Sequence, residues 1–295
     1  MGISFDINAS NAAFSSPDCD GSFPAQFRDY LGAMGQLRPS VVLAFAPKAA
    51  GTYLRSAACV ATGGSLVRTV HAQGGRDASF YMPTFVMYYA GGFPENTMVT
   101  HVHMQALPAN RHFINALGLK PVVMIRSIPD MLASYADMLD EDPLSPDNWL
   151  NIRLPSNYAA LDTKTKNDFL VQMIGPWYAS YFATWLEFAD AAPGRVCILR
   201  YDEFKTDPAE SLERLLAHSS VSRTRAECQS ALDIVWDARN NFRFNKGVSG
   251  RGRDRFNVAQ IALLHRQIAF YPNLAAVADE LIPAYQAPSL QTSAA

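Results

Sequence analysis

The residues best suited to chemistry in this chain follow a short apolar segment, residues 41–46. A proline, a lysine, small residues, a hydroxyl and an aromatic come next, in the order Pro47, Lys48, Ala49, Ala50, Gly51, Thr52 and Tyr53. Small residues let a backbone approach an oxyanion closely, and a helix beginning at Gly51 would add unpaired N–H groups and its dipole. The order therefore predicts an anion-binding turn, although an ordinary strand–helix turn has a similar composition. It is not a Walker loop, because Lys48 precedes the glycine.

A second pair of candidates follows another apolar segment, residues 121–125. Arg126 comes directly after it, where a strand would end, and open α/β sheets bind ligands at that end. Ser134 follows eight residues later, inside a helix expected to start near Pro129. Helical geometry lets its hydroxyl face the same anion. Arg126 alone would be read as a surface ion pair, and its spacing to Ser134 favours an anion site.

Positive charge is concentrated between residues 239 and 255, in a chain whose formal net charge is −2. The segment holds one acid, Asp254, and these cations: Arg239, Arg243, Lys246, Arg251, Arg253 and Arg255. Such a local excess predicts a polyanionic ligand.

Two histidines, His101 and His103, lie in a third apolar segment, residues 97–103. The two-residue period of a strand places both on one face. A neutral imidazole is a common general base near neutral pH. Each could equally be a buried histidine with a structural role.

The elements that must position these residues alternate along the chain. Apolar runs predict strands at 41–46, 97–103, 121–125 and 195–199, and periodic patterns predict helices at 51–61, 108–117, 129–138, 164–191, 208–218, 223–237 and 258–269. This alternation predicts an α/β fold, a single domain with a central, mainly parallel sheet flanked by helices. We place the domain at residues 39–286, with an irregular lead-in (1–38) packed on it and a disordered tail (287–295).

Composition excludes several classes of protein. A net charge of −2 over 295 residues gives no nucleic-acid signal. No apolar run reaches the roughly 18 residues of a membrane span, and the first residues lack the pattern of a signal peptide. The four cysteines are scattered, which favours reduced thiols over disulfides or zinc. We expect a cytoplasmic protein.

The chemistry-bearing segments together resemble one enzyme family. Residues 47–53 are similar to the phosphosulfate-binding loop of the sulfotransferases that use 3′-phosphoadenosine 5′-phosphosulfate (PAPS). Arg126 and Ser134 resemble the pair that holds the nucleotide's 3′-phosphate in that family. Residues 200–208 resemble its Tyr-Glu-Asp-Leu/Met-Lys…Pro segment, with Tyr201 in the place of the tyrosine that contacts adenosine. By the residues alone, Asp202 and Glu203 are candidate N-caps of the next helix.

The basic segment resembles the family's Arg-Lys-Gly-x-x-Gly-Asp-Trp motif only in part. Three positions match, namely Lys246, Gly247 and Gly250. Asn245 stands where the family has its arginine, and Arg251-Gly252 stand where it has Asp-Trp. Arg251 and Arg243 are the candidates to replace the missing cation.

The family's catalytic histidine stands in a Thr-His-Leu-Pro context followed by Leu-Pro. His101 matches it best, because Leu107-Pro108 then falls in register, and His103 is the alternative. The resemblance covers about residues 41–256 and implies a P-loop-NTPase-like sulfotransferase fold. It implies transfer of a sulfuryl group from PAPS to a hydroxyl, less readily an amine, with no metal. Lys48 would face the leaving oxygen, and adenosine 3′,5′-bisphosphate (PAP) would be the product.

Two other functions stay open. A P-loop-type kinase would need a Gly-Lys-Ser/Thr loop and a magnesium-binding carboxylate, and the sequence shows neither. A nucleotide-binding module would bind without transfer. Aromatic residues within 80–93, with Trp149 and Trp177, suggest a small apolar or aromatic acceptor, although they could be core. The acceptor's identity and the oligomeric state cannot be read from the residues.

Overall fold

The computed structural model of the protein describes residues 40–71, 77–87, 96–141, 154–238 and 248–284. Among the described residues a five-stranded sheet forms the centre of the molecule. Its strands lie in the order β2 (Ser65–Leu66), β3 (Met98–Val102), β1 (Ser40–Ala44), β4 (Pro121–Ile125) and β5 (Cys197–Arg200). All neighbouring strands are parallel. This confirms the predicted single α/β domain and its parallel sheet, and adds the short strand β2, which has no signal in the sequence.

The register explains why candidate residues meet at one edge. β1 and β3 pair with Leu43 opposite His101, and β4 and β5 pair with Ile125 opposite Arg200. β1, β3 and β4 are almost wholly buried, as expected for parallel strands covered on both faces. Because the strands run the same way, their carboxyl ends point to the same edge of the sheet. The residues that follow β1, β3, β4 and β5 lie there.

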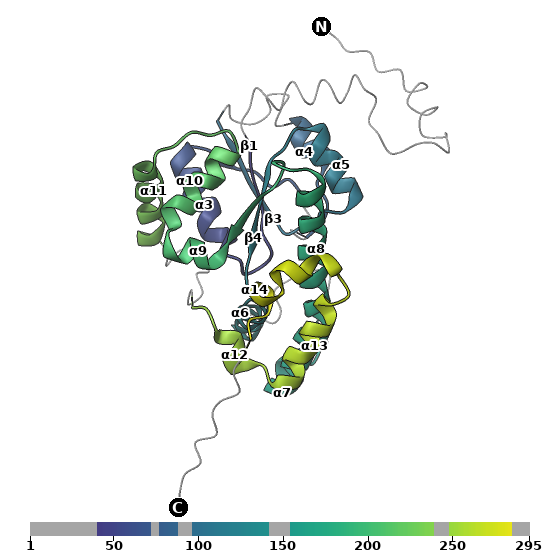
Figure 1. Cartoon of the computed structure of the whole chain (residues 1–295). Coiled ribbons are helices and arrows are strands. Elements are labelled where there is room, and N and C mark those ends of the chain that lie inside the picture. The colour runs from purple at the N-terminus through teal and green to yellow at the C-terminus, as the bar shows by residue number, and fades with distance from the viewer. Residues whose placement is uncertain (1–39, 72–76, 88–95, 142–153, 239–247, 285–295) are drawn as a thin grey trace, which may run out of the picture.

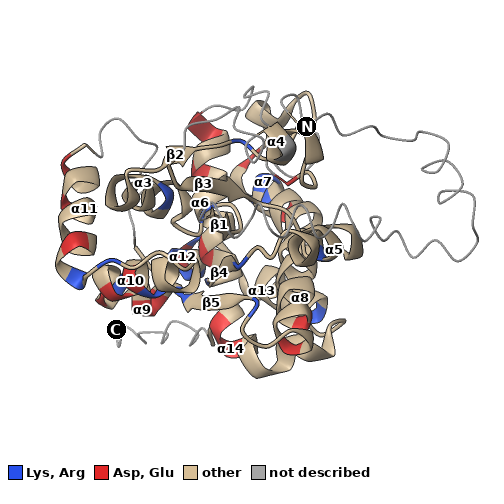
Figure 2. Ribbon diagram, turned by 90° about the horizontal axis from the view of Figure 1, so that it is seen from above, with Lys and Arg blue, Asp and Glu red and all other residues tan. Residues whose placement is uncertain are grey.

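Helices cover both faces of this sheet. Figure 1 shows α3, α10 and α11 on one side and α5 and α8 on the other. The α-helices of the described residues are α3 (Gly51–Thr62), α4 (Met82–Met87), α5 (Pro108–Ala116), α6 (Ile128–Glu141), α7 (Thr163–Phe169), α8 (Gly175–Ala191), α9 (Tyr201–Thr206), α10 (Pro208–His218), α11 (Arg225–Asp237), α12 (Arg251–Arg255), α13 (Val258–Ile268) and α14 (Ala278–Leu281). Figure 2 shows acidic and basic segments close together around α9, α10 and α12.

The longest predicted helix differs from expectation in its middle. Residues 164–191 were expected to be one helix, but a π-helical segment, Leu170–Ile174, separates α7 from α8. A π turn shifts the side chains that follow it around the axis. Apolar side chains recur every three or four residues along this segment, which predicts a core-facing stripe made of Phe169, Met173, Trp177, Tyr181, Trp185 and Phe188. Core packing is confirmed for Tyr181, Trp185 and Phe188, which are buried, and it is wrong for Met173, which lies in the π segment and is 51% exposed.

One capping prediction is also wrong. Asp202 and Glu203 were expected to cap the helix after β5, but its N-cap is Arg200 and both acids lie in the first turn of α9. The helix begins directly at the strand end, which leaves no turn for a capping side chain. The acids still face the positive end of the helix dipole.

The predicted lead-in (1–38) and tail (287–295), together with Trp149, lie outside the described residues. Of the described helices, none is both long enough and apolar enough to cross a bilayer.

Candidate functional site

The loop after β1 turns sharply before helix α3 begins. Lys48 and Ala50 have φ angles of 67° and 62°, in the left-handed region that residues with a side chain rarely adopt. Each such residue costs about 1–2 kcal/mol, so the surroundings must hold the loop in this shape. Tyr178 of α8, which is fully buried, donates a hydrogen bond to the carbonyl oxygen of Pro47 at 3.0 Å. The core thus holds the loop in a strained conformation.

Helix α3 directs its first N–H groups toward this loop. No side chain caps its N-terminus at Ala50, and its first turn contains no acid. Ala49 and Gly51 are buried, whereas Thr52 and Tyr53 are half-buried. An uncapped helix N-terminus attracts an anion through its unpaired N–H groups and its dipole. The predicted anion-binding turn therefore lies at the N-terminus of a helix that has no side-chain cap, and anion binding there stays a prediction.

Arg126 connects this loop to the next element. Its guanidinium donates a short hydrogen bond to the carbonyl oxygen of Lys48 and lies 3.9 Å from the ring centroid of Tyr201. Burial raises the pKa of Tyr201, and the charge of Arg126 opposes that rise. Within the described residues the Nε of Arg126 is buried and has no hydrogen-bond partner. Three strand ends, those of β1, β4 and β5, therefore meet at one arginine.

Ser134 lies further along the helix that follows Arg126. It is on α6 and is buried, with 4% of its surface exposed. Asp130, one helical turn before it, is also buried and accepts hydrogen bonds from the backbone N–H groups of Gly250 and Gly252, both at 2.8 Å. The predicted Arg126–Ser134 region is therefore in contact with the glycine-rich part of the basic segment.

The two histidines lie against each other at the end of β3. Their ring centroids are 4.7 Å apart in an edge-to-face arrangement, which confirms that both lie on one face. His101 packs directly against Gly51, because a Cβ atom there would lie 2.1 Å from the His101 Nε2. His101 is thus at the first residue of α3, beside the anion-binding turn.

His103 is held by a backbone contact. Its Nδ1 lies 2.6 Å from the carbonyl oxygen of Phe45. A carbonyl can only accept, so Nδ1 carries the proton, and in the neutral ring Nε2 then has the lone pair. Both candidate bases therefore lie at the end of β3, and which of them accepts the proton stays a prediction.

Aromatic side chains surround Tyr53, the last residue of the loop motif. Its ring centroid is 6.2 Å from that of Phe204 and 6.4 Å from that of Trp236, both edge-on, and its hydroxyl donates to the carbonyl of Leu232 at 3.2 Å. Trp236, on α11, is 44% exposed. Trp236 was not among the residues predicted from the sequence, where it is marked only by its position near the end of the predicted helix 223–237.

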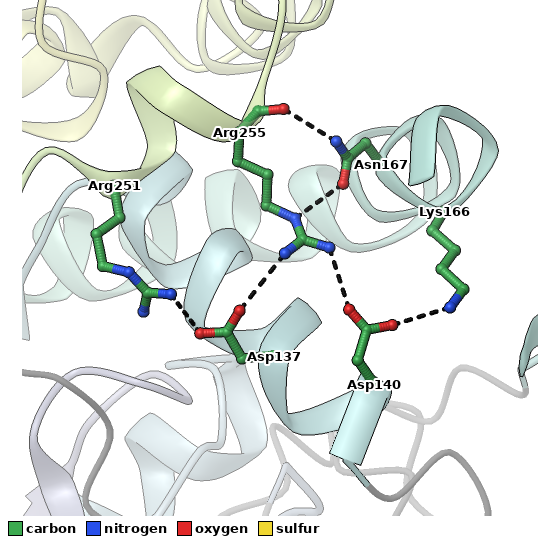
Figure 3. A network of polar contacts seen from close by, with 6 residues as sticks. All are labelled: Asp137, Asp140, Lys166, Asn167, Arg251 and Arg255. Atoms are coloured by element: carbon green, nitrogen blue, oxygen red, sulfur yellow. Dashed lines mark hydrogen bonds and ion pairs between the residues drawn. The ribbon is translucent and has the colours of Figure 1, made fainter. Parts of the chain in front are cut away.

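The described part of the basic segment is paired with acids of the same chain. Arg251 forms an ion pair with Asp137 of α6, and Arg255 contacts Asp137 at 3.5 Å and Asp140 at 3.4 Å. Asn167 of α7 accepts from the Nε of Arg255 at 2.9 Å. Figure 3 shows these contacts, which connect α12 to α6 and α7. The positive excess predicted from the sequence is therefore partly neutralised, and Arg251 stays a prediction as a nucleotide contact.

Other predicted residues are not brought to this site or are not described. Arg239, Arg243, Asn245, Lys246 and Gly247 lie outside the described residues. The aromatic run at 80–93 is described only to residue 87. There Phe85 is fully buried, and its ring centroid is 4.9 Å from that of Phe113. In the described part of the chain no three or more His, Cys, Asp or Glu side chains are grouped so that they could hold a metal ion.

Two solved structures that share this fold were each solved with PAP. Mouse sulfotransferase SULT7A1, solved with PAP, superposes with a TM-score of 0.58 at 15% identity, over 84% of this chain and 90% of that chain. Retinol dehydratase, solved with androsterone and the inactive cofactor PAP, gives 0.50 at 13% identity, over 88% of this chain and 87% of that one. Identities this low establish the shared fold alone. No curated protein matches the sequence.

The family model described as "Sulfotransferase domain" matches residues 93–273, well over half of the chain. That span includes β3 with both histidines, Arg126, Ser134, Tyr201 and α12, and it begins after the Lys48 loop. The chain belongs to the sulfotransferase domain family.

Proposed function

We propose that the protein transfers a sulfuryl group from PAPS to a hydroxyl, less readily an amine, of a small molecule. The observation that carries this proposal is the position of Arg126, which bonds to the carbonyl of Lys48 and stacks on Tyr201. Two anion-binding features, the α3 N-terminus and the Arg126 guanidinium, are thereby joined at one sheet edge. PAPS carries two separate anionic groups, a 5′-phosphosulfate and a 3′-phosphate, and so matches this pair.

The aromatic residues beside these features suit a nucleoside. Tyr201 lies under Arg126, and Tyr53 lies beside the half-exposed Trp236. Stacking of a base on an aromatic face contributes about 1–3 kcal/mol. We assign the adenosine to the neighbourhood of Tyr53, Tyr201 and Trp236, with the 5′-phosphosulfate at Lys48 and residues 49–53.

The reaction requires neutralisation of the leaving group and removal of one proton. The acceptor oxygen would bond to sulfur as the bond from sulfur to the phosphate oxygen breaks, and the acceptor proton would pass to a histidine. Lys48 and the backbone N–H groups at the start of α3 would stabilise the charge that develops on the leaving phosphate, and preorganised contacts of this kind make a large contribution to catalysis in many enzymes. PAP then carries this charge away.

We propose His101 as the base, because it packs on Gly51 at the anion-binding turn. His101→Asn should lower kcat by about 10²–10⁴ and leave the Kd for PAP within about threefold. His103→Asn is the matched control. It should be milder, because the His103 ring is held at the carbonyl of Phe45 and its loss would act on transfer only through the position of His101. If His103→Asn abolished transfer while His101→Asn did not, His103 would be the base.

The acceptor is proposed to be small and apolar. Trp177, half-buried on α8, stacks on Tyr181 at 5.2 Å between ring centroids, and Tyr81 is 39% exposed. The structure of retinol dehydratase with androsterone favours an apolar acceptor within this fold. We also propose that the domain spans residues 39–286 and that the protein acts in the cytoplasm.

The decisive experiment is a transfer assay with ³⁵S-labelled PAPS over phenols, alcohols, lipids and sugars, without added metal and with a chelator. Labelled product with any acceptor supports the proposal. Binding of PAP without transfer to any acceptor would favour the nucleotide-binding module. A parallel assay with ³²P-labelled ATP and Mg²⁺ tests the kinase, which transfer of labelled phosphate would favour.

A further inference from the structure

The glycine-rich turn before α12 is bound to one buried carboxylate. Asp130, 3% exposed on α6, accepts from the N–H of Gly250 through Oδ2 and from the N–H of Gly252 through Oδ1, each at 2.8 Å. Both oxygens of the carboxylate are used, and both donors are backbone groups at the start of α12. Hydrogen bonds to a charged acceptor are the stronger kind. This contact fixes the turn at the helix that follows Arg126.

The approach of the two elements is close enough to require glycine. A Cβ atom at Gly252 would lie 2.4 Å from the Cβ of Pro129 and 2.6 Å from its carbonyl carbon. These neighbours belong to the first turn of α6 and cannot move without moving that turn. Any side chain at residue 252 would therefore push α12 away from Asp130.

The same turn also contacts the helix on the other side of Arg126. The hydroxyl of Ser249 lies 3.3 Å from Oδ1 of Asp202, and it accepts from the Nζ of Lys205 at 3.3 Å. Asp202 directly follows Tyr201, on whose ring Arg126 stacks. Residues 249–252 thus connect α9 to α6 across the pair formed by Arg126 and Tyr201.

Further acids continue the attachment along α6. Asp137 and Asp140 are seven and ten residues beyond Asp130, spacings that keep all three on one side of a helix. They pair with Arg251 and Arg255, as Figure 3 shows. The carboxylates of α6 therefore hold α12 at both of its ends.

We propose that Asp130 is a positioning residue for the nucleotide. By docking residues 250–252 onto α6, it shapes the end of the site that contains Arg126 and Ser134, without itself touching the ligand. This inference rests on the proposed function, because the ligand at that end would be the 3′-phosphate. Loss of the docking should weaken recognition of that phosphate more than recognition of the rest of the nucleotide.

The test compares PAP with AMP, which lacks the 3′-phosphate. Asp130→Asn keeps the shape of the side chain but leaves one oxygen to accept, so one of the two N–H groups would face an amide NH₂. Asp254→Asn is the matched control, since Asp254 lies in the same short helix with its side chain 81% exposed. Affinities are measured by calorimetry, and backbone exchange of residues 248–256 is followed by mass spectrometry.

We expect Asp130→Asn to reduce the preference for PAP over AMP at least fivefold, to leave the Kd for AMP within about twofold and to speed exchange in residues 248–256. Asp254→Asn should change none of these. Gly252→Ala, which keeps the carboxylate but displaces α12, should reproduce the loss of preference and serves if Asp130→Asn does not fold.

Equal losses of PAP and AMP affinity would indicate a general structural role and overturn the inference. An unchanged preference in Asp130→Asn would also overturn it, while the proposed function would stand. If the wild-type protein does not prefer PAP over AMP, the proposed function fails, and the exchange rates alone then decide whether Asp130 docks α12.

Discussion

Removal of Arg126 should damage nucleotide binding more than any other single change at the strand ends. Arg126→Ala deletes the donor to the Lys48 carbonyl and the cation 3.9 Å from the Tyr201 ring. A hydrogen bond from a charged group contributes about 1.5–3 kcal/mol, and a partly desolvated cation–π contact about 0.5–2 kcal/mol. The unliganded protein should therefore lose about 2–4 kcal/mol of unfolding free energy. The substitution also removes the cost of burying the guanidinium charge, which offsets part of the loss.

The effect on the ligand is separate from this stability loss. Leaving an anion without its buried charged partner costs about 2–4 kcal/mol, which corresponds to a roughly 30- to 700-fold increase in the Kd for PAP. Titration calorimetry at a temperature where both variants are folded measures it directly. Arg126→Lys should recover part of the charge but neither the fork geometry nor the stacking.

Arg223 provides the matched control, because it contacts the C-terminal end of helix α3, whereas Arg126 contacts the loop before its N-terminal end. Arg223 donates through Nε to the carbonyl of Ala61 at 2.6 Å, near the last turn of α3. Arg223→Ala should lower stability and leave the Kd for PAP within about threefold. The reasoning is refuted if Arg126→Ala binds PAP as tightly as wild type, or if Arg223→Ala loses as much affinity.

Two further predictions concern the loop lysine and a buried tyrosine. Lys48→Ala should slow transfer, measured by single-turnover kinetics, by about two to three orders of magnitude, and should change the Kd for PAP less. Lys164→Ala, which removes an exposed lysine, is its control. Normal transfer by Lys48→Ala at saturating PAPS would contradict the role of Lys48. Tyr158 is 2% exposed, and burial, with a smaller contribution from Asp140, raises its pKa to about 12 against the opposing charge of Arg255. Because the unfolded chain releases this proton near pH 10, stability should be full below pH 10 and fall between pH 10 and 12 by roughly 2–3 kcal/mol for this group. Urea denaturation at several alkaline pH values measures the free energy of unfolding. Its fall with pH should be smaller in Tyr158→Phe than in wild type, with Tyr81→Phe as the exposed control. An equal fall in Tyr158→Phe and wild type would contradict the assignment.

The local pattern of the sequence determined the elements and the residues that end them. Apolar runs marked β1, β3 and β4 because a strand buried on both faces needs consecutive apolar side chains, and a further short run marked the edge strand β5. Parallel strands bring their carboxyl ends together, so Lys48, Arg126 and Tyr201 could be expected at one edge before any contact was known. The strand period likewise placed His101 and His103 on one face.

The tertiary structure decided the pairings between distant segments. The count of cations at 239–255 could not show that Arg251 and Arg255 meet Asp137 and Asp140, because those acids are more than a hundred residues away. Nor could it show that Asp130 binds the glycine-rich turn, or that Trp236 lies beside Tyr53. Such contacts depend on how α6, α11 and α12 pack, and packing of whole elements leaves no periodic signal in the residues that make it.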